Sequence, residues 1–456
     1  MTTTRFVIAL GIFVLSACGS RVTPVPLEPI AQPPIDTEVL TQASPLPGTA
    51  PLHIHGTMAW YQGEQINVDI PAAWMAQHYD FTEQGDAGSA FANSFMAAGG
   101  KYAVLYTDPE IVPRCNSPFA TASGAKPGTC AGPMGSSLNG VETAWLHDKY
   151  GNRLHVTAYG TQPQGYWQDR VNPNYASLPS VYRSWVSSII LTNRWNAVEA
   201  DDFQSGYDPS YFTYKFGATA REFDALGTTA NSTWLAAQQR IFAASPKPVL
   251  INGILPYAAS TAIASTNVLG VMLESCATTV TTTGVGGTTW IANMNELLLA
   301  TSLHKYAVCI NYAPTVSNGV AERLYGLASW WLTYDSTYSV NFVDVPTSDK
   351  HEVYPEHGIA VYSPVTSPTT SIAALRTVGG VYLREFAYCY VNKVAIGACA
   401  AEVNPDSVAH SVPVTHYAYK HYLSLTSTSW YSGGAVAWVA GTFTTLPMHS
   451  ARILKI

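Results

Sequence analysis

Two stretches decide the fold of this chain: Asn-Ala-Val-Glu-Ala-Asp-Asp-Phe at 196–203 and Leu-Gly-Val-Met-Leu-Glu-Ser at 269–275. Each is a short apolar run that leads straight into carboxylates. Near-continuous apolar runs of this length are typical of parallel strands that are buried on both faces. A strand that ends in an acid places that acid at the rim of its sheet, where a ligand can reach it.

Similar runs recur through residues 52–355 and alternate with helix-type segments. We expect strands near 56–60, 77–81, 102–106, 197–201, 249–254, 270–274, 306–312 and 338–343. We expect helices at 181–193, 215–226, 231–243, 291–303 and 319–333. Eight strands with intervening helices over roughly 300 residues predict an α/β fold, a (β/α)8 TIM barrel. A doubly wound open sheet is the alternative.

Two regions depart from this alternation. Residues 107–180 are rich in Gly, Pro, Asn and Ser, which predicts a long excursion over the barrel mouth with a short strand at 153–159. From residue 356 the pattern becomes β-type, with strands expected at 381–390, 394–403, 416–425 and 434–443. We therefore expect a small C-terminal antiparallel β domain, sandwich-like, over 356–456.

The N-terminus has the pattern of a targeting segment. Arg5 precedes an apolar run that ends in Leu-Ser-Ala-Cys at 15–18, which resembles a bacterial lipoprotein signal. We expect residues 1–18 to be the signal peptide, with Cys18 lipidated, and the Pro-rich residues 19–51 to form a tether. An ordinary cleaved signal peptide is the alternative. The pattern predicts an exported lipoprotein, anchored to a membrane on the periplasmic or cell-surface side.

Cysteine count and charge narrow the chemistry further. Six cysteines follow the signal, and an even number in an exported protein indicates disulfides, for which we predict the pairs Cys115–Cys130, Cys276–Cys309 and Cys389–Cys399. The sequence contains no Cys-x-x-Cys spacing, so a zinc site is not favoured. The net charge is −7 and no Lys/Arg run occurs, which argues against a nucleic-acid partner. No Gly-x-Gly-x-x-Gly or Walker-type loop supports a nucleotide cofactor, and we expect none.

The two acid-tipped strands supply the candidate catalytic residues. Side chains alternate between the faces of a strand, so Glu199 and Asp201 share one face with Ala197, whereas Asp202 lies on the other face. On the second strand the same alternation turns Glu274 inward with Met272. Paired carboxylates that face one cavity are the groups that cleave glycosidic bonds. The alternative is that these acids cap helices or form ion pairs at strand ends.

Other polar residues are expected near the same rim. The candidates for binding substrate hydroxyls are Asp108, Asn252, Asn311, Asp80 and Asp202, each of which could instead serve a turn. His53 and His55 form a His-x-His that metal-dependent barrel hydrolases use. Those enzymes need further ligands at later strand ends, and His304 precedes its strand, so we predict no metal site.

Several short motifs carry a family resemblance. They are Lys101–Pro109, Val198–Asp202, Pro248–Gly253 and Gly270–Glu274, followed by Val381–Phe386 and Val403–Pro405 in the C-terminal part. With them the chain resembles a hypothetical family of glycoside hydrolase-like TIM-barrel proteins. The resemblance implies a barrel, a C-terminal β domain and carboxylate chemistry on a polysaccharide. Glu199 stands where such proteins usually carry an apolar residue, which leaves open whether Glu199 or Asp201 is the second working acid.

These observations predict a surface-anchored glycoside hydrolase. Asp201 would attack or stabilise the anomeric carbon, and Glu274 would protonate the leaving oxygen. The expected partners are a polysaccharide or oligosaccharide substrate and, through the lipid anchor, a membrane. A non-catalytic carbohydrate-binding or envelope-scaffold lipoprotein on the same fold is the rival hypothesis, and a metal-dependent hydrolase using His53 and His55 is a more distant one.

Overall fold

The computed structural model describes most of the chain beyond residue 70. The described residues are 56–58, 70–85, 88–113, 132–138, 140–148, 150–154, 156, 168–206, 209–216, 231–254, 258–279, 284–313, 319–344, 353–368, 370–412, 415, 417–426, 428, 431–441 and 443–456. His53, His55, Cys18, Cys115 and Cys130 lie outside them, so the predictions made for these five residues stay predictions.

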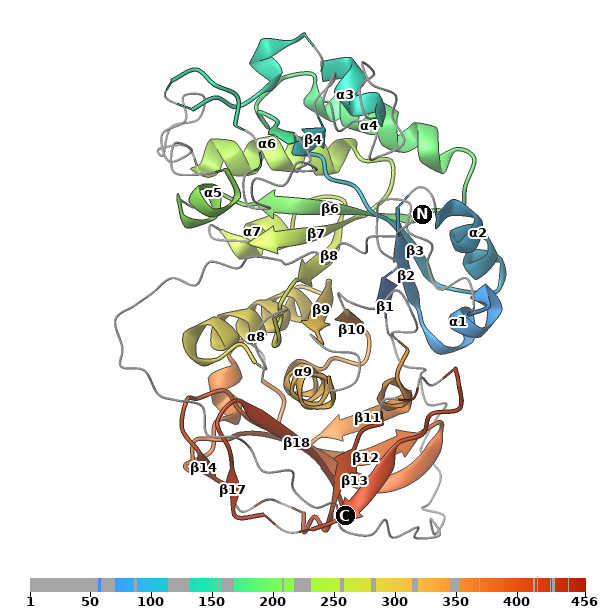
Figure 1. Cartoon of the computed structure of the whole chain (residues 1–456), viewed down its shortest axis with the longest axis vertical. Coiled ribbons are helices and arrows are strands. Elements are labelled where there is room, and N and C mark those ends of the chain that lie inside the picture. The colour runs from blue at the N-terminus through green and yellow to red at the C-terminus, as the bar shows by residue number, and fades with distance from the viewer. Residues whose placement is uncertain are drawn as a thin grey trace, which may run out of the picture.

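Eight parallel strands form the larger sheet (Figure 1). In sheet order they are β1 (Gly56–Met58), β2 (Phe81–Gln84), β3 (Tyr102–Leu105), β6 (Ala197–Gln204), β7 (Val249–Ile254), β8 (Val268–Leu273), β9 (Tyr306–Tyr312) and β10 (Ser339–Asp344). The first and last strands contact each other. The sheet is therefore barrel-like, as predicted, although no hydrogen-bonded pairing of β1 with β10 closes the ring among the described residues.

Helices alternate with these strands, and those at 178–190, 231–244, 287–302 and 320–333 overlap predicted helices. They are α1 (Ala72–His78), α2 (Ser89–Ala97), α4 (Leu178–Ile190), α5 (Pro209–Phe216), α6 (Asn231–Ala244), α7 (Ala259–Ile263), α8 (Gly287–Ser302) and α9 (Val320–Thr333). None of these described helices is long and apolar enough to cross a membrane.

The excursion between β3 and α4 has structure of its own. It contains β4 (Ile111–Pro113), α3 (Gly132–Leu138), the 3-10 turn η2 (Glu142–Ala144) and β5 (Gln168–Arg170). β4 and β5 pair antiparallel, which anchors both ends of the excursion next to the larger sheet.

Strand alternation sorts the side chains of the larger sheet into two layers. Phe81, Val104, Ala197, Leu250 and Met272 belong to one cluster, made of strand residues only, that fills the interior of the sheet. Many of their neighbours along the strands pack outward against helices in two separate clusters. Ala197 of β6 and Met272 of β8 therefore face the interior of the sheet, as predicted.

The C-terminal part is a six-stranded antiparallel sheet. In sheet order its strands are β11 (Ile359–Pro364), β12 (Tyr382–Val391), β13 (Val394–Asn404), β18 (Ser450–Lys455), β15 (His421–Ser424) and β16 (Ala437–Ala440). A ribbon of β14 (His410–Ser411) and β17 (Thr445–Leu446) and the 3-10 turns η4 (Pro355–Gly358) and η5 (Ile372–Leu375) complete it.

Helix α9 joins the two sheets into one core. It contacts β9 and β10 on one side and β12, β13 and β18 on the other. Trp330 and Trp331 lie fully buried between the sheets, as Figure 1 shows for the helix as a whole. Arg384 on β12 donates from its guanidinium to the carbonyls of Trp331, Leu332 and Tyr334 and so caps the end of α9.

Two predicted disulfides are present, Cys276–Cys309 and Cys389–Cys399. The first joins Cys276, which follows β8, to Cys309 in the middle of the neighbouring strand β9, and the second lies between β12 and β13.

Several expected elements differ from the structure. The strand expected at 77–81 begins only at Phe81, because 72–78 form α1, where Trp74 stacks on His78 one helical turn later. Of the strand expected at 153–159, Arg153 forms an isolated bridge with His147, and residues 155 and 157–159 lie outside the described part of the chain. The helix expected at 215–226 is described only at 215–216, which end α5, and α1, α2 and α7 were not predicted. Strands β11 and β18 have no counterpart among the predicted strands.

Candidate active site

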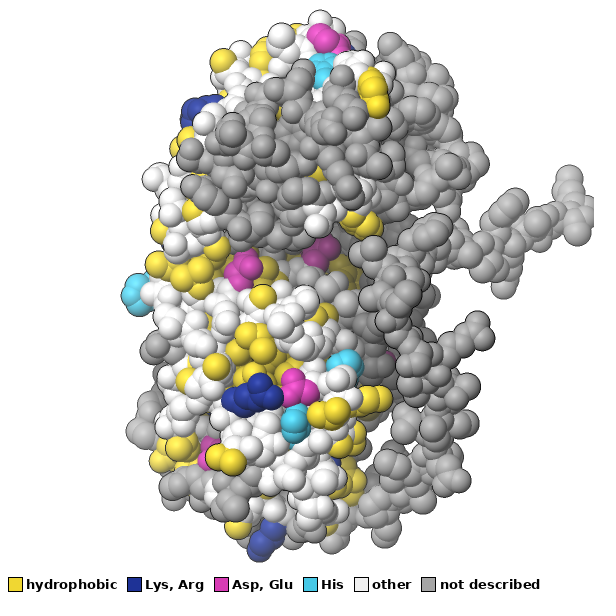
Figure 2. Space-filling model, turned by 90° about the vertical axis from the view of Figure 1, so that its left-hand side faces the viewer, with side chains coloured by type: hydrophobic (Ala, Val, Ile, Leu, Met, Phe, Trp, Pro, Cys, Tyr) yellow, Lys and Arg dark blue, Asp and Glu magenta, His cyan; other side chains and the backbone are white. Residues whose placement is uncertain are grey.

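The carboxyl ends of β3, β6, β7 and β8 converge on one group of polar side chains. Tyr106 follows β3, Glu199 and Asp201 lie on β6, Asn252 lies on β7 and Glu274 follows β8. In parallel sheets of this kind the functional side chains lie at the carboxyl ends of the strands. Figure 2 looks onto this end of the molecule and shows acidic side chains in a hollow across its middle.

Asn252 is the centre of the group. Its side-chain nitrogen Nδ2 donates to Glu199 Oε1 at 2.9 Å, to Asp201 Oδ1 at 2.9 Å and to Glu274 Oε1 at 3.0 Å. Two amide hydrogens thus serve three carboxylates. All three predicted catalytic acids therefore lie within hydrogen-bonding distance of the same nitrogen, Nδ2 of Asn252.

The three acids differ in their access to solvent. Glu199 is 2% exposed and lies in the floor of the site, whereas the Glu274 side chain is open to solvent. Asp201 is intermediate. Of these three acids, Asp201 and Glu274 are therefore the ones that a ligand can touch.

Asp201 is held by three hydrogen bonds. Besides Asn252, the hydroxyl of Tyr106 donates to its Oδ2 at 2.6 Å and the backbone amide of Asp202 donates to its Oδ1 at 2.7 Å. Burial raises the pKa of Asp201 well above its ordinary value, and the charges of Asp202 and Glu274 raise it further. The bond from Tyr106 opposes that rise because it stabilises the anion.

The pKa of Glu274 is raised as well. The main cause of this rise is the loss of hydration around the carboxyl group, although part of the side chain reaches solvent. Hydrogen bonds from Asn252 and Tyr312 act in the opposite direction. General acid catalysis requires a carboxyl group with a raised pKa, and here it lies next to a carboxyl group that accepts several hydrogen bonds.

A β-bulge places both aspartates of β6 at the site. Ala200 pairs with Ile251 and Phe203 with Gly253, so Asp201 and Asp202 together face the single residue Asn252. Asp202 has φ 53°, outside the extended region. The predicted alternation placed Asp202 on the opposite face. That prediction is wrong, because the extra residue of the bulge interrupts the two-residue period.

Gly253 permits this bulge. Its φ is +146°, and a Cβ on it would lie 2.2 Å from the carbonyl oxygen of Phe203. The two backbones can approach here only because residue 253 has no side chain.

Asp202 is paired with a cation that the sequence did not reveal. Lys215 on α5 places its ammonium 2.8 Å from Asp202 Oδ2, and Tyr211 on the same helix donates to Asp202 Oδ1 at 2.6 Å. The backbone carbonyl of Asp202 accepts a bond from Arg170. Lys215, Tyr211, Tyr106 and Tyr312 were all missed, because nothing in their local sequence ties them to β6 or β8.

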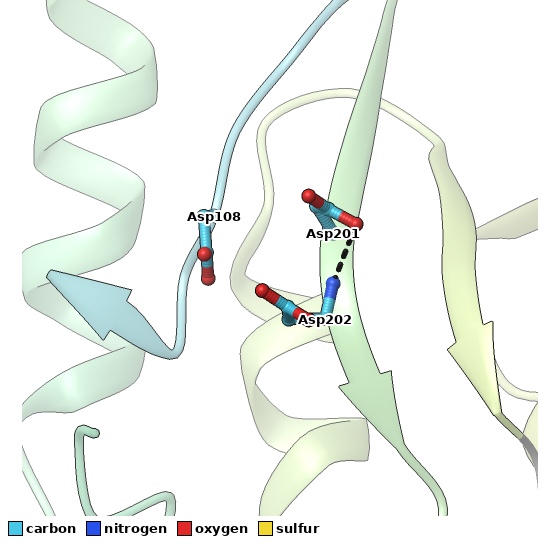
Figure 3. A group of neighbouring side chains, drawn as sticks. All are labelled: Asp108, Asp201 and Asp202. Atoms are coloured by element: carbon cyan, nitrogen blue, oxygen red, sulfur yellow. Dashed lines mark hydrogen bonds between the residues drawn. The ribbon is translucent and has the colours of Figure 1, made fainter. Parts of the chain in front are cut away.

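Asp108 lies next to the two aspartates of β6 (Figure 3). Three carboxylate oxygens, one each from Asp108, Asp201 and Asp202, lie within 4.8 Å of one another. Asp108 accepts backbone bonds from Glu110 and Ile111, which makes it a turn residue as well. Because Lys215 already supplies a positive charge at Asp202, we assign no metal to this group.

Two predicted binding residues lie elsewhere. Asp80 precedes β2, at the amino end of the sheet, where its carboxylate is 3.8 Å from Lys101. Asn311 points outward from β9: it accepts from the amide of Ala277 at 3.0 Å and donates to Asn341 at 3.2 Å. Neither is brought to the group around Asn252. His304 has φ 57° and precedes β9, also at the amino end.

No family model and no curated protein matches the sequence. Among solved structures, the glycoside hydrolase domain of PelA from Pseudomonas aeruginosa is similar at 12% identity and a TM-score of 0.40, covering 65% of this chain and 96% of that one. The alpha-glucosyl transfer enzyme XgtA is similar at 7% identity and a TM-score of 0.43, covering 88% and 98%. An alpha-amylase from Geobacillus thermoleovorans, complexed with acarbose, is similar at 7% identity and a TM-score of 0.41, covering 88% and 98%. At these identities the chemistry has to be judged from the site itself.

Proposed function

We propose that the protein is a glycoside hydrolase that cleaves a polysaccharide or oligosaccharide with retention of anomeric configuration. One observation carries this proposal: Asp201 and Glu274 both accept hydrogen bonds from Asn252 Nδ2, at 2.9 and 3.0 Å. Two oxygens bound to one atom lie no farther apart than twice that bond length. Retaining enzymes hold their carboxyl groups about 5–5.5 Å apart, whereas inverting enzymes need roughly 6.5–9.5 Å to admit a water.

The surroundings of each acid support a division of roles. Asp201 receives three hydrogen bonds that favour its anion, so it is the nucleophile. The pKa values of both carboxyls are raised, so the pair retains a proton. We assign this proton to Glu274, which is open to solvent and therefore serves as the acid and base.

The reaction follows from these roles. Asp201 attacks the anomeric carbon while Glu274 transfers its proton to the leaving glycosidic oxygen. Water then replaces Asp201 as Glu274 takes one of its protons.

Variants of the two acids test the proposal. We expect Asp201→Asn and Glu274→Gln each to lower hydrolysis of any glycan that the wild type cleaves by at least about a hundredfold, measured as released reducing ends. Asp80→Asn is the matched control, because Asp80 lies at the amino end of the sheet and its variant should keep wild-type activity. Glycan binding without turnover by the wild type, or full activity in both variants, would contradict the proposal and favour a binding protein.

Azide separates the two roles. In Asp201→Ala, azide should replace the nucleophile and give a glycosyl azide of inverted configuration. In Glu274→Ala, azide should intercept the glycosyl-enzyme and give the retained configuration. Proton NMR of the products distinguishes the two anomers, and a direct inverted product from the wild type would contradict retention.

We also propose that the enzyme is exported and anchored through Cys18. The disulfide Cys276–Cys309 supports an oxidising compartment. A lipid label on the mature protein that is lost in Cys18→Ser, together with release of that variant from the membrane fraction, is the expected result. A labelled Cys18→Ser variant would contradict it.

A further inference from the structure

Arg170, the last residue of β5, links the excursion between β3 and α4 to the candidate active site. Its side chain is 0% exposed and forms an ion pair with Glu110, whose side chain is 1% exposed. Glu110 precedes β4, so both partners belong to the excursion. A buried ion pair overcomes the loss of hydration only when further contacts hold its groups in place. The other contacts of this guanidinium therefore indicate what it positions.

Three aromatic rings surround the guanidinium of Arg170. Its central carbon lies 5.8 Å from the ring centre of Phe212, 5.9 Å from that of Phe216 and 5.8 Å from that of Trp234. At such distances a cation is attracted to the face of an aromatic ring. Phe212 and Phe216 pack against each other on α5, on either side of Lys215 in the sequence. The guanidinium thus packs against the helix that carries Lys215.

The same guanidinium contacts strand β6. Its Nη1 donates to the backbone carbonyl of Asp202 at 3.3 Å. Asp202 is the bulge residue with φ 53°, and its carboxylate lies 2.8 Å from the ammonium of Lys215. Arg170 therefore contacts both elements that meet in the Asp202–Lys215 ion pair, the backbone of β6 and the aromatic rings of α5.

We propose that Arg170 is a positioning residue that holds Lys215 on Asp202 and thereby sets the charge beside Asp201. A planar guanidinium suits this role, because its faces pack on rings while its edge donates to oxygens. The alternative is that Arg170 serves only as the counter-ion of Glu110. The effect on Asp201 rests on the proposed function, but the placement of Lys215 does not.

The Asp202–Lys215 pair lies among groups that titrate. Besides Arg170, those that act on the pair among the described residues come from α5, β6 and the ends of β3 and β8, and they are Tyr211, Asp201, Asp108 and Glu274. The charge of Asp202 raises the pKa of Asp201 and of Glu274, whereas the charge of Lys215 lowers the pKa of Glu274. If Lys215 left Asp202, both raised pKa values would rise further.

Acylation of lysines tests the placement of Lys215 without any substrate. Acetic anhydride reacts with an amine that is exposed and unprotonated, so a buried ammonium bound to Asp202 is protected. In folded Arg170→Lys we expect Lys215 to be acylated at least about tenfold faster than in wild type, because local opening exposes it. Peptide mass spectrometry measures the rate at each lysine. Lys101, at the amino end of the sheet, is the internal reference.

Two variants of Arg170 keep the test independent of a folding defect. Arg170→Lys retains a positive charge opposite Glu110 but lacks the planar guanidinium that contacts the rings and the carbonyl together. Arg170→Met combined with Glu110→Gln removes both charges and so leaves no unpaired buried ion. Circular dichroism checks folding, and either variant that folds suffices.

Arg153→Met is the matched control. The carboxylate partners of Arg153, Glu142 and Asp169, both belong to the excursion, so this variant should leave Lys215 protected. Unchanged protection of Lys215 in a folded variant of Arg170 would overturn the proposal. Equal exposure of Lys215 in Arg153→Met would overturn it as well, because any loosening of the excursion would then be sufficient.

The pH profile of hydrolysis gives a second readout once a substrate is known. Arg170→Lys should move the acidic limb of kcat/KM to higher pH, because Asp202 then acts on Asp201 without compensation from Lys215. A merely structural role would lower the rate at every pH without moving that limb. If no glycan is cleaved, the acylation rates still decide the placement of Lys215. If Lys215 stays protected, Asp201 and Glu274 keep their proposed roles.

Discussion

Asn252 is the residue on which the site depends most. Its amide nitrogen donates to three carboxylates that come from β6 and from the end of β8. Without Asn252 these carboxylates would still repel one another, and each would lose a hydrogen-bond donor. Hydrogen bonds to charged groups contribute about 1.5–3 kcal/mol each, but a crowded set of acids responds by taking up protons, which reduces the loss.

We expect Asn252→Leu to lower the free energy of unfolding at pH 7 by about 2 kcal/mol. At pH 4 the loss should be smaller, because protonated carboxyls can bond to one another. Asn252→Asp, which adds a fourth acid, should lose more at pH 7 and recover more at pH 4. Urea denaturation at both pH values measures this, and an equal loss at both would contradict the account.

Removal of Asp201 should stabilise the protein as pH rises. Its pKa is raised in the folded state, so its favourable contribution is complete below the ordinary Asp value near 4 and is lost as pH increases toward the raised value. Asp201→Asn should therefore gain stability relative to wild type as pH rises above about 4. Such a gain at an active-site acid is the usual exchange of stability for function.

Glu142 is the control of opposite sign. Arg153 and His147 lower the pKa of this carboxyl to about 2. Glu142→Gln should therefore lose stability relative to wild type as pH rises from 2 to 5, by a small amount because Glu142 is exposed. Thermal melts of both variants across pH give the comparison, and parallel curves for Asp201→Asn and wild type would contradict the raised pKa.

At the scale of the element, the bulge in β6 decides which acids face the site. A regular strand would place Asp201 and Asp202 on opposite faces. The bulge keeps Asp201 and Asp202 together and hands Asp202 to Lys215 on α5. The charge beside the nucleophile is thereby partly neutralised by a helix that follows the strand directly.

Gly253→Ala should disrupt this element. Its Cβ would meet the backbone of Phe203, and its φ is also unfavourable for alanine, so we expect a loss of about 2–4 kcal/mol. Gly397→Ala is the matched control, because Gly397 also has positive φ but no atom within 4 Å of its added Cβ. Its loss should stay near 1–2 kcal/mol. Equal losses in the two variants, measured by urea denaturation, would show that the close approach is unimportant.

At the scale of the whole molecule, α9 makes the barrel-like sheet and the C-terminal sheet into one folding unit. The same cluster of buried side chains runs from β8 and β9 through α8 and α9 to β12 and β13. Arg384 adds three hydrogen bonds from the C-terminal sheet to the end of α9. We therefore expect the two sheets to unfold together.

Arg384→Met should lower stability by about 2–4 kcal/mol while unfolding remains a single transition in calorimetry. Arg384→Lys should recover only part of this loss, because a single ammonium on a shorter side chain cannot replace both Nη1, which serves the three carbonyls, and Nε, which donates to the carbonyl of Thr366. A separate, earlier transition of the C-terminal sheet in the wild type would contradict the shared core.

The sequence by itself determined the parallel strands, the acids at their ends and two of the three predicted disulfide pairs. Apolar runs such as 306–312 and 249–254 have lengths and periods that local sequence specifies. Only the tertiary structure decided which acids meet. Asp80 and Asn311 have strand-end patterns like that of Asn252, yet strand direction and face remove them from the site. Nothing in the local sequences of Lys215 and Tyr312 indicates that they reach the site, and the bulge at Asp202 depends on Gly253 of the next strand. Distances between strands are set by packing, and packing is not encoded in any single segment.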